Sequence, residues 1–263
     1  MEINKQLSLM TVTYERDFDL LERLLVSIEK FHQTEYQHYI ILNDDIAFMP
    51  ELNSILAKFS NKFIVIHYEE FKEMQAPEVE NCKFGKRTHH GGWFRQIILT
   101  LLAATKIATP YYLHICSKDR FIGKFNIDNL IQGDKFLAQL ENTTYHSSCN
   151  AEFDEYFINA YKLFDLDPKQ YKEKTIRPST PAIIKTQQVL DMILDLTNSN
   201  LHLIDIIGGN AEWCKSHNKT VEYYLYSAWL AKNNLTDDTI IWGNATHRQF
   251  NTTQGTYDLR RTN

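Results

Sequence analysis

The segment between Glu80 and Asp119 contains no acidic residue, although the chain carries a formal net charge of −5. Its lysines and arginines are Lys83, Lys86, Arg87, Arg95, Lys106 and Lys118. A Gly91-Gly92 pair precedes a predicted helix, and a helix N-terminus presents free N–H groups with partial positive charge. Arginine binds phosphate through paired hydrogen bonds, and lysine adds a point charge. The segment therefore predicts a site for a diphosphate or another anion, with a solvated basic loop as the alternative.

Glu222 is the candidate for acid–base chemistry. It lies in the first turn of a predicted helix, within the sequence TVEYYLY of residues 220–226, where the helix dipole favours a carboxylate. The aromatic neighbours, Tyr223 among them, could line an apolar cleft and raise the pKa of Glu222 toward neutrality. The alternative is a helix-capping glutamate beside core tyrosines.

Polar residues follow three predicted strands directly, in the ranges Thr13–Asp17, Asn43–Asp45 and Cys116–Asp119. In open α/β sheets, ligands bind beyond the carboxyl ends of the strands, so these residues are expected to meet at one edge. Asn43 and Asp44 could bond a base edge or ribose hydroxyls, and Tyr14 could stack on a ring. The alternative for each range is an ordinary polar loop.

The sequence Cys116-Ser117-Lys118-Asp119 occupies the place where an Asp-x-Asp metal motif would be expected. An ammonium is no metal ligand, and a hard cation such as magnesium requires oxygen atoms. Asp44 and Asp45 are adjacent on an extended strand, so their carboxylates point apart. A zinc site built from the histidines of the basic segment and Cys116 lacks a closed spacing pattern. We therefore predict no metal and no other cofactor.

The elements that would position these residues alternate between apolar runs and amphipathic stretches. Strands are predicted at residues 7–13, 38–42, 62–67 and 111–116, and helices follow from about residue 17, at 50–59 and at 93–106. This alternation predicts an α/β fold with a mostly parallel sheet flanked by helices. The long connection of residues 68–92 is of a kind that is often functional or mobile.

The second half of the chain is less regular. It shows a strand-like segment near Tyr145, a Pro-marked turn at Arg177–Pro181, and helices at about residues 187–196 and 220–232. The tail, residues 242–263, is predicted as a loop. No shift in composition separates two folding units, so we expect one domain, residues 1–263, with two lobes.

Composition excludes several classes of protein. The 15 Phe, 14 Tyr and 4 Trp supply ample surface to bury, which rules out a disordered chain. The negative net charge argues against nucleic-acid binding. The four cysteines are far apart, no apolar run reaches membrane-spanning length, and the N-terminus lacks a signal-peptide pattern. We therefore expect a cytoplasmic protein with reduced thiols.

Five motifs occur along the chain in the order SLMTVTYERDFDLLERLLVSI, HYIILNDD, GGWFRQIILTLL, YYLHICSKDRFIGKF and VEYYLYSAWL. Together they resemble a bacterial family of glycosyltransferase-like proteins with a GT-A fold, often found with surface-polysaccharide genes. The resemblance implies transfer of a sugar from a nucleotide-sugar donor to a hydroxyl of a glycan or lipid-linked acceptor. It also implies a Rossmann-like nucleotide-sugar-binding half, residues 1–130, and an irregular acceptor and catalytic half, residues 131–263.

The resemblance assigns roles to individual residues. Thr13 and Tyr14 would meet the nucleotide, Asn43 and Asp44 would face its base or ribose, and Arg95 and Gln96 would lie on the helix after the donor loop. Together with these residues, we expect Lys86, Arg87, Lys118, Asp119 and Tyr223 to bind substrate. Glu222 would deprotonate the acceptor hydroxyl in an inverting reaction and play another role in a retaining one.

The segment CSKD departs from the family's pattern, because Cys116 replaces its first aspartate. This implies either a metal-independent enzyme, with lysines and arginines compensating the charge of the leaving diphosphate, or an inactive one. The rival hypothesis is therefore a catalytically silent nucleotide- or glycan-binding partner in a polysaccharide assembly. A sugar-phosphate nucleotidyltransferase is a weaker option, because no Gly-rich loop follows the first strand. Arg248, Arg260 and Arg261 could touch an anionic acceptor or the inner face of the membrane, or be merely solvated.

Overall fold

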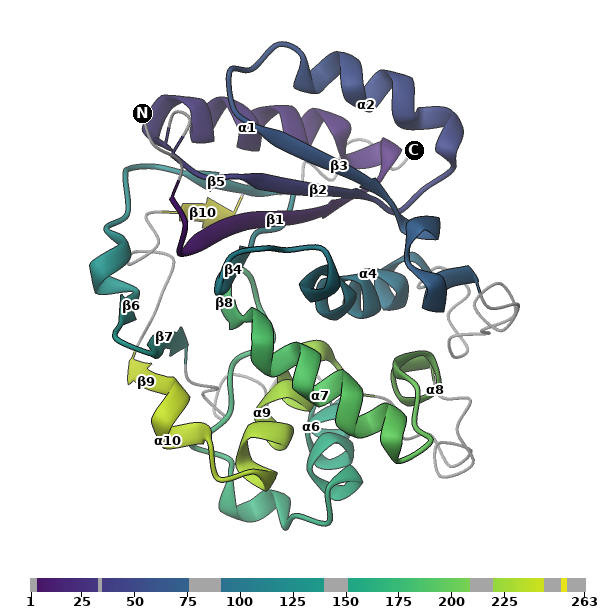
Figure 1. Cartoon of the computed structure of the whole chain (residues 1–263), viewed down its shortest axis with the longest axis vertical. Helices are drawn as coiled ribbons and strands as arrows, with labels where there is room; N and C mark the ends of the chain where they lie inside the picture. Colours follow the sequence, from purple (N-terminus) through teal and green to yellow (C-terminus); the bar gives the residue numbers. More distant parts are fainter. Residues whose placement is uncertain are drawn as a thin grey trace.

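A five-stranded sheet with the order β3-β2-β1-β4-β8 forms the centre of the computed structural model (Figure 1). Its strands are β1 (Leu7–Thr13), β2 (His38–Leu42), β3 (Phe63–His67), β4 (Tyr111–His114) and β8 (Ala182–Lys185). The first four run parallel, and β8 pairs antiparallel with β4. The predicted mostly parallel sheet is therefore confirmed. The structure describes residues 4–32, 35–75, 91–139, 151–208, 220–243 and 252–254.

Helices cover both faces of this sheet. The helices α1 (Phe18–His32) and α2 (Met49–Leu56) lie on one face, and α4 (Gly91–Leu102) lies on the other (Figure 1). In α1 the residues Leu21, Leu24, Leu25 and Ile28 are buried, at the spacing of one helix face. Strand β1 is buried along its entire length because it is covered on both sides.

The second half of the chain builds a helical layer on the α4 side of the sheet. It consists of α6 (Ala151–Leu163), α7 (Thr186–Asn198), α8 (Leu203–Gly208), α9 (Glu222–Lys232) and the short α10 (Thr236–Thr239) (Figure 1). Helix α9 packs against α4, α6 and α7. Every residue from Glu222 to Ala231 is buried, so α9 is a central helix covered on all sides.

Two small sheets complete the described fold. One joins β6 (Ile131–Gln132), β7 (Lys135–Gln139) and β9 (Ile240–Gly243), and the other joins β5 (Asp119–Phe121) to β10 (Thr252–Gln254). The expectation that the tail is a loop was therefore wrong in part. In β10 the backbone of Thr252 and Thr253 pairs with that of Phe121 and Arg120 in an antiparallel ladder. This pairing satisfies the backbone hydrogen-bonding groups of β10. A segment of three residues is too short for its sequence pattern to predict a strand.

Most predicted elements are present with shifted ends. The predicted strand at residues 111–116 ends at His114, because the chain turns where the Asp119 carboxylate accepts the N–H of Cys116 at 2.9 Å. The predicted helix at residues 93–106 is α4 followed by a 3-10 turn, Ala103–Thr105. The strand-like segment near Tyr145 lies outside the described residues.

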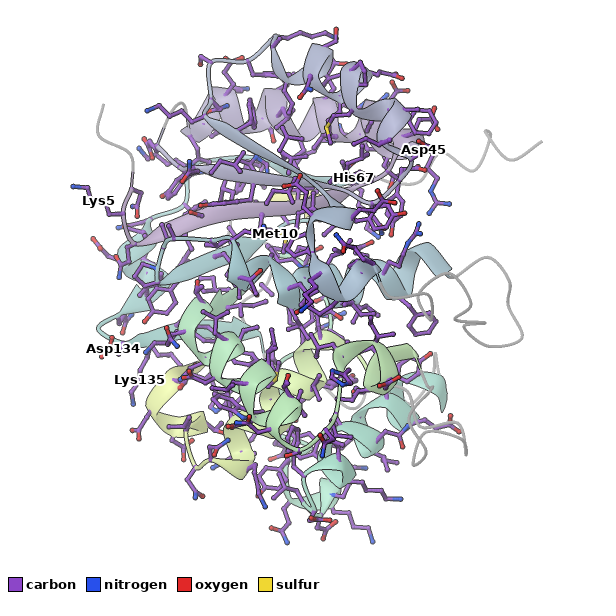
Figure 2. All side chains as sticks on the ribbon, turned by 45° about the vertical axis from the view of Figure 1, so that its right-hand side comes forward. Lys5, Met10, Asp45, His67, Asp134 and Lys135 are labelled. Atoms are coloured by element: carbon purple, nitrogen blue, oxygen red, sulfur yellow. The ribbon has the colours of Figure 1, made fainter. Side chains whose placement is uncertain are left out.

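The two ends of the parallel strands lie on opposite sides of the molecule. Lys5, just before β1, lies on one side, while His67 at the end of β3 and Asp45 just after β2 lie on the other (Figure 2). Met10 is fully buried in the centre of β1 between them (Figure 2). The polar segments after the strands are therefore gathered at one edge of the sheet.

Candidate functional site

The three polar segments after β1, β2 and β4 are hydrogen-bonded to one another. Asn43 donates from its backbone N–H to Thr13 O at 2.9 Å and from its side-chain amide to the Tyr14 hydroxyl at 2.9 Å. The hydroxyl of Ser117 donates to Thr13 Oγ1 at 3.2 Å. The expected convergence at one edge is thus confirmed, and it follows from the parallel pairing of β1 with both neighbours.

A cavity of about 310 Å³ opens at this edge, between the two halves of the chain. The segment after β1, the end of β4 with the turn after it, α4, the loop before β8 and the start of α9 all contribute to its wall. Its lining residues are Tyr14, Arg16, Asp17, Leu20, Gln96, His114, Cys116, Lys118, Pro178, Ser179, Thr180, Glu222 and Tyr223. Five of the predicted site residues therefore share one cavity.

The cavity combines two cations with two carboxyl groups. Arg16 and Lys118 are the cations, and Asp17 and Glu222 are the acids. Burial raises the pKa of Asp17, and the positive charges of Arg16 and Lys118 oppose this rise. An anion that enters the cavity would meet both cations, as a phosphate group requires.

Glu222 is the most strongly perturbed carboxyl group in the cavity. Only 8% of the residue is exposed, and burial raises its pKa from 4.5 to about 8, although its own backbone N–H offsets part of the rise. The expected direction of the shift is confirmed. A carboxyl group with a pKa near physiological pH exchanges its proton readily, which is the property of a general acid or base.

Helix α9 holds Glu222 through polar contacts along its length. The Tyr223 hydroxyl lies 2.6 Å from His114 Nδ1 on β4, the Tyr226 hydroxyl donates to Gln188 Oε1 at 2.6 Å, and Trp229 Nε1 donates to Asp195 Oδ2 at 2.8 Å. These bonds tie α9 to β4 and to α7. Because these bonds prevent α9 from turning about its axis, they hold the Glu222 side chain in a fixed position in the cavity wall.

The turn after β4 does not offer the ligands of a hard divalent cation. Burial, together with the Asp119 carboxylate, raises the pKa of the Cys116 thiol to about 11, so it keeps its proton. Asp119 is fully buried, and its Oδ2 accepts the backbone N–H of Cys116. Within the described ranges, no three His, Cys, Asp or Glu side chains form a group that could hold a metal ion. These donors do not fit Mg²⁺ or Mn²⁺.

The residues expected to contact a nucleoside are occupied by contacts within the protein. Tyr14 lines the cavity, but only 7% of it is exposed, and the Arg16 guanidinium lies 5.1 Å from its ring centroid. Its hydroxyl also donates to Gln96 Oε1 at 3.4 Å. Thr13 and Asn43 are fully buried and do not line the cavity. They support its wall rather than present a surface to a ligand.

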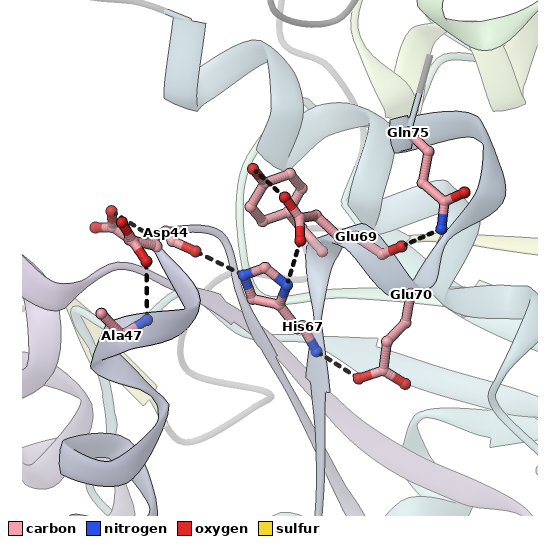
Figure 3. Close-up of polar contacts among 8 residues, drawn as sticks. Asp44, Ala47, His67, Glu69, Glu70 and Gln75 are labelled. Carbon is pink, nitrogen blue, oxygen red and sulfur yellow. Dashed lines mark hydrogen bonds and ion pairs between the residues drawn. The ribbon is translucent and has the colours of Figure 1, made fainter. Parts of the chain in front are cut away.

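Asp44 also lies outside the wall of the cavity and orders the turn after β2 (Figure 3). Its carboxylate accepts the N–H of Glu15 at 3.2 Å and that of Asp45 at 2.9 Å. The ring of His67 at the end of β3 donates from Nε2 to the Asp44 carbonyl at 2.8 Å (Figure 3). The backbone N–H of His67 in turn donates to Glu70 Oε1 at 2.8 Å (Figure 3). This network fixes the segment that carries Arg16.

Of the basic residues predicted for one site, the described part of the chain brings Lys118 to the cavity but not Arg95. Lys118 lines the cavity, whereas the Arg95 guanidinium lies 4.9 Å from the ring centroid of Tyr68 and does not line it. Lys86 and Arg87 lie outside the described residues, as do Arg248, Arg260 and Arg261. The predicted anion site therefore rests, in the described part of the chain, on Lys118 and Arg16.

Sequence reasoning did not select Arg16 or His114 as substrate-binding residues. Arg16 lies two residues beyond Tyr14, in the 3-10 turn Glu15–Asp17 between β1 and α1. His114 is the last residue of β4, and Cys116 and Lys118 follow in the turn after it; all three line the cavity. The signal for His114 was its place at the carboxyl end of a predicted strand. The loop Pro178–Thr180 enters the wall through the antiparallel pairing of β8, which nothing in the sequence indicates.

Two solved structures that resemble this chain are of glycosyltransferases. Core-mannan synthase A from Aspergillus fumigatus, solved in a Mn/GDP form, matches with a TM-score of 0.53 and 9% identity, covering 91% of this chain and 73% of that chain. The galactosyltransferase LgtC, solved with donor and acceptor sugar analogs, matches with a TM-score of 0.51 and 10% identity, covering 90% of this chain and 73% of that chain. The fold is therefore the GT-A fold, as the resemblance implied.

By sequence, no curated protein matches the chain. None of the described helices is long and apolar enough to cross a membrane. One family does match, over residues 2–255, and its description is Family of unknown function (DUF6492). Because this match spans nearly the whole chain, the protein belongs to that family.

Proposed function

We propose that the protein is a glycosyltransferase that moves a sugar from a nucleotide-sugar donor to a hydroxyl of a glycan or lipid-linked acceptor. The observation that carries this proposal is the shared cavity of Lys118, Arg16 and Glu222, at the carboxyl edge of a GT-A sheet. The cations supply charge for a leaving diphosphate, and the carboxyl group has a pKa of about 8. A role in bacterial surface-glycan assembly rests on the sequence resemblance.

In this proposal Glu222 is the general base. Its ionised carboxylate takes the proton of the acceptor hydroxyl as the acceptor oxygen attacks the anomeric carbon, while the bond from that carbon to the diphosphate oxygen breaks. The negative charge that develops on the diphosphate is compensated by Lys118 and Arg16. Direct attack of this kind, from the side of the sugar opposite the diphosphate, inverts the configuration at the anomeric carbon, so the proposal is for an inverting reaction.

The proposed reaction needs no divalent metal. In its support, Lys118 stands where an Asp-x-Asp motif would place a ligand, and the Cys116 thiol holds its proton. The expected result is full transfer activity in EDTA. A loss of activity in EDTA that magnesium or manganese restores would contradict this part of the proposal.

The test is sugar transfer and donor hydrolysis with UDP-, GDP- and CMP-linked sugars. Glu222→Gln keeps the shape of the side chain and removes the base, so we expect a rate loss of about 100-fold or more. Lys118→Ala removes a cation beside the leaving group, with an expected loss of about 100-fold. The matched controls Glu51→Gln on α2 and Lys62→Ala before β3 alter exposed residues away from the cavity and should retain activity. Wild-type rates in both cavity variants would refute the assignments.

The same cavity could belong to a binding protein without turnover, because Cys116 departs from the family's aspartate. Thermal shifts with UDP, GDP, CMP and their sugars distinguish this alternative, since a ligand stabilises the folded chain by mass action. Stabilisation by a nucleotide-sugar, without any product after long incubation, would favour the binding protein.

A further inference from the structure

His114 is a buried histidine in the cavity wall, and its second ring nitrogen has no partner among the described residues. Its exposed fraction is 1%, and its Nδ1 lies 2.6 Å from the Tyr223 hydroxyl. Within the described part of the chain, Nε2 makes no hydrogen bond. A buried polar nitrogen without a partner costs free energy, so it calls for an explanation such as a ligand or an ordered water.

The contact with Tyr223 determines which nitrogen of His114 carries the proton. Burial raises the pKa of the Tyr223 hydroxyl well above its usual value, so the phenol keeps its proton. Among the described residues, His114 Nδ1 is the acceptor within reach of that O–H group. The Tyr223 hydroxyl therefore donates to Nδ1, and the neutral imidazole carries its own proton on Nε2. His114 thus offers a fixed N–H donor.

The charge of His114 narrows the class of ligand. Burial lowers its pKa to about 3, so the ring is neutral at physiological pH. A neutral N–H group is less suited to a diphosphate than the cations Arg16 and Lys118, which line the same cavity. It is suited to an uncharged oxygen acceptor. His114 and Glu222 line the same cavity, so that oxygen would lie in the cavity that holds the acid–base group.

We propose that His114 is a sugar-binding residue, and that its Nε2–H donates a hydrogen bond to a hydroxyl oxygen of a sugar in the cavity. This inference rests on the proposed function, because a sugar must enter the site. The sugar is either the one transferred or the one that accepts it, and the two share the same hydroxyl chemistry. Tyr223 is then a positioning residue, which acts by holding the tautomer of His114.

The experiment compares His114→Phe with His114→Gln in the full chain. Phenylalanine removes both nitrogens, while the glutamine amide can place an N–H near the position of Nε2. We expect His114→Phe to raise the KM of one substrate by roughly tenfold, as for the loss of a buried hydrogen bond, and His114→Gln to restore part of this loss. A rise in the donor KM assigns the contact to the transferred sugar, and a rise in the acceptor KM assigns it to the acceptor.

A matched control is His32→Phe, the same substitution at another buried histidine. His32 is the last residue of α1, and its ring packs against Tyr36, Phe121 and Phe125. It does not line the cavity. We expect both KM values to stay at the wild-type level. Melting temperatures of all variants show which of them are folded.

A binding measurement keeps the proposal testable if His114→Phe turns over too slowly. A donor nucleotide-sugar should raise the melting temperature of the wild type more than its free nucleotide does, and for a contact to the transferred sugar His114→Phe should lose only this difference. If the wild type is active and His114→Phe leaves the KM values and the melting shifts unchanged, the sugar contact of His114 is refuted, and its Nε2–H bonds to water at most. The proposed function would still stand. A wild type that binds and turns over no nucleotide-sugar would overturn the proposed function, and the sugar contact with it.

Discussion

Glu222 owes its properties to its position at the first residue of a helix that is buried on all sides. The helix dipole favours a negative charge there, but burial opposes it more strongly and raises the pKa to about 8. The folded chain therefore keeps a proton that the unfolded chain releases near pH 4.5. This difference has consequences for both activity and stability.

The activity should follow the ionisation of Glu222. A general base acts in its deprotonated form, so kcat/KM should rise about tenfold per pH unit below pH 8 and level off above it. Donor hydrolysis or transfer, measured from pH 6 to pH 9.5, checks this expectation. A flat profile across this range would exclude Glu222 as the base.

The stability should respond in the opposite direction. Between pH 4.5 and about 8 the folded state holds a proton that the unfolded state has lost, so the free energy of unfolding falls as pH rises, by about 1.4 kcal/mol per unit. The amide that Glu222→Gln introduces does not titrate. We therefore expect the melting temperature of this variant, relative to the wild type, to increase steadily from pH 5 to pH 8. Parallel curves would show that Glu222 is not held neutral by burial.

At the scale of elements, the sequence determines the strands better than it determines the site. The predicted strand at residues 7–13 matches β1 to the residue, because its apolar run is buried on both faces. The site depends on tertiary contacts instead. Arg16 enters it through a short 3-10 turn, and Pro178–Thr180 enter it through the antiparallel β8, and neither arrangement has a local pattern. Asp44 was predicted from its place after β2, but its carboxylate oxygens bind backbone N–H groups.

The turn after β2 offers a test of how the carboxyl edge is held together. The ring of His67 donates to the Asp44 carbonyl at 2.8 Å, and only 5% of this histidine is exposed. His67→Ala removes that donor and leaves a cavity, so we expect a loss of roughly 1–3 kcal/mol in the free energy of unfolding. Urea denaturation measures it. The exposed His202→Ala should change stability by less than about 0.5 kcal/mol, and an equal loss in both variants would contradict the role of His67.

At the scale of the whole molecule, three buried histidines in separate regions make the fold sensitive to acid. Burial lowers the pKa of His32 to about 4 and those of His38 and His114 to about 3. Below pH 6.5 the unfolded chain binds protons that the folded chain does not, so stability falls as pH decreases. The three histidines outnumber the opposing buried carboxyl groups, Glu222 and Asp17, whose pKa values burial raises. The values for the three histidines and Glu222 place the balance point, where stability is highest, between about pH 6 and pH 7.

The steepness with which stability falls as pH decreases can be measured, and a substitution should change it. His32→Phe removes one of the three titrating groups while keeping an aromatic ring beside Phe121 and Phe125. We expect the melting temperature of this variant to fall less steeply than that of the wild type between pH 6.5 and pH 4.5. Identical slopes would show that His32 is not held neutral in the folded chain.

The antiparallel strand β8 has a consequence for any attempt to divide the protein. It pairs along the whole of β4, with Tyr111 opposite Lys185 and His114 opposite Ala182. A truncated chain that stops before residue 182 would expose the open hydrogen-bonding groups of β4 beside an apolar surface, and such bare edges recruit other chains. The first lobe produced by itself should therefore self-associate, even though it contains most of the parallel strands.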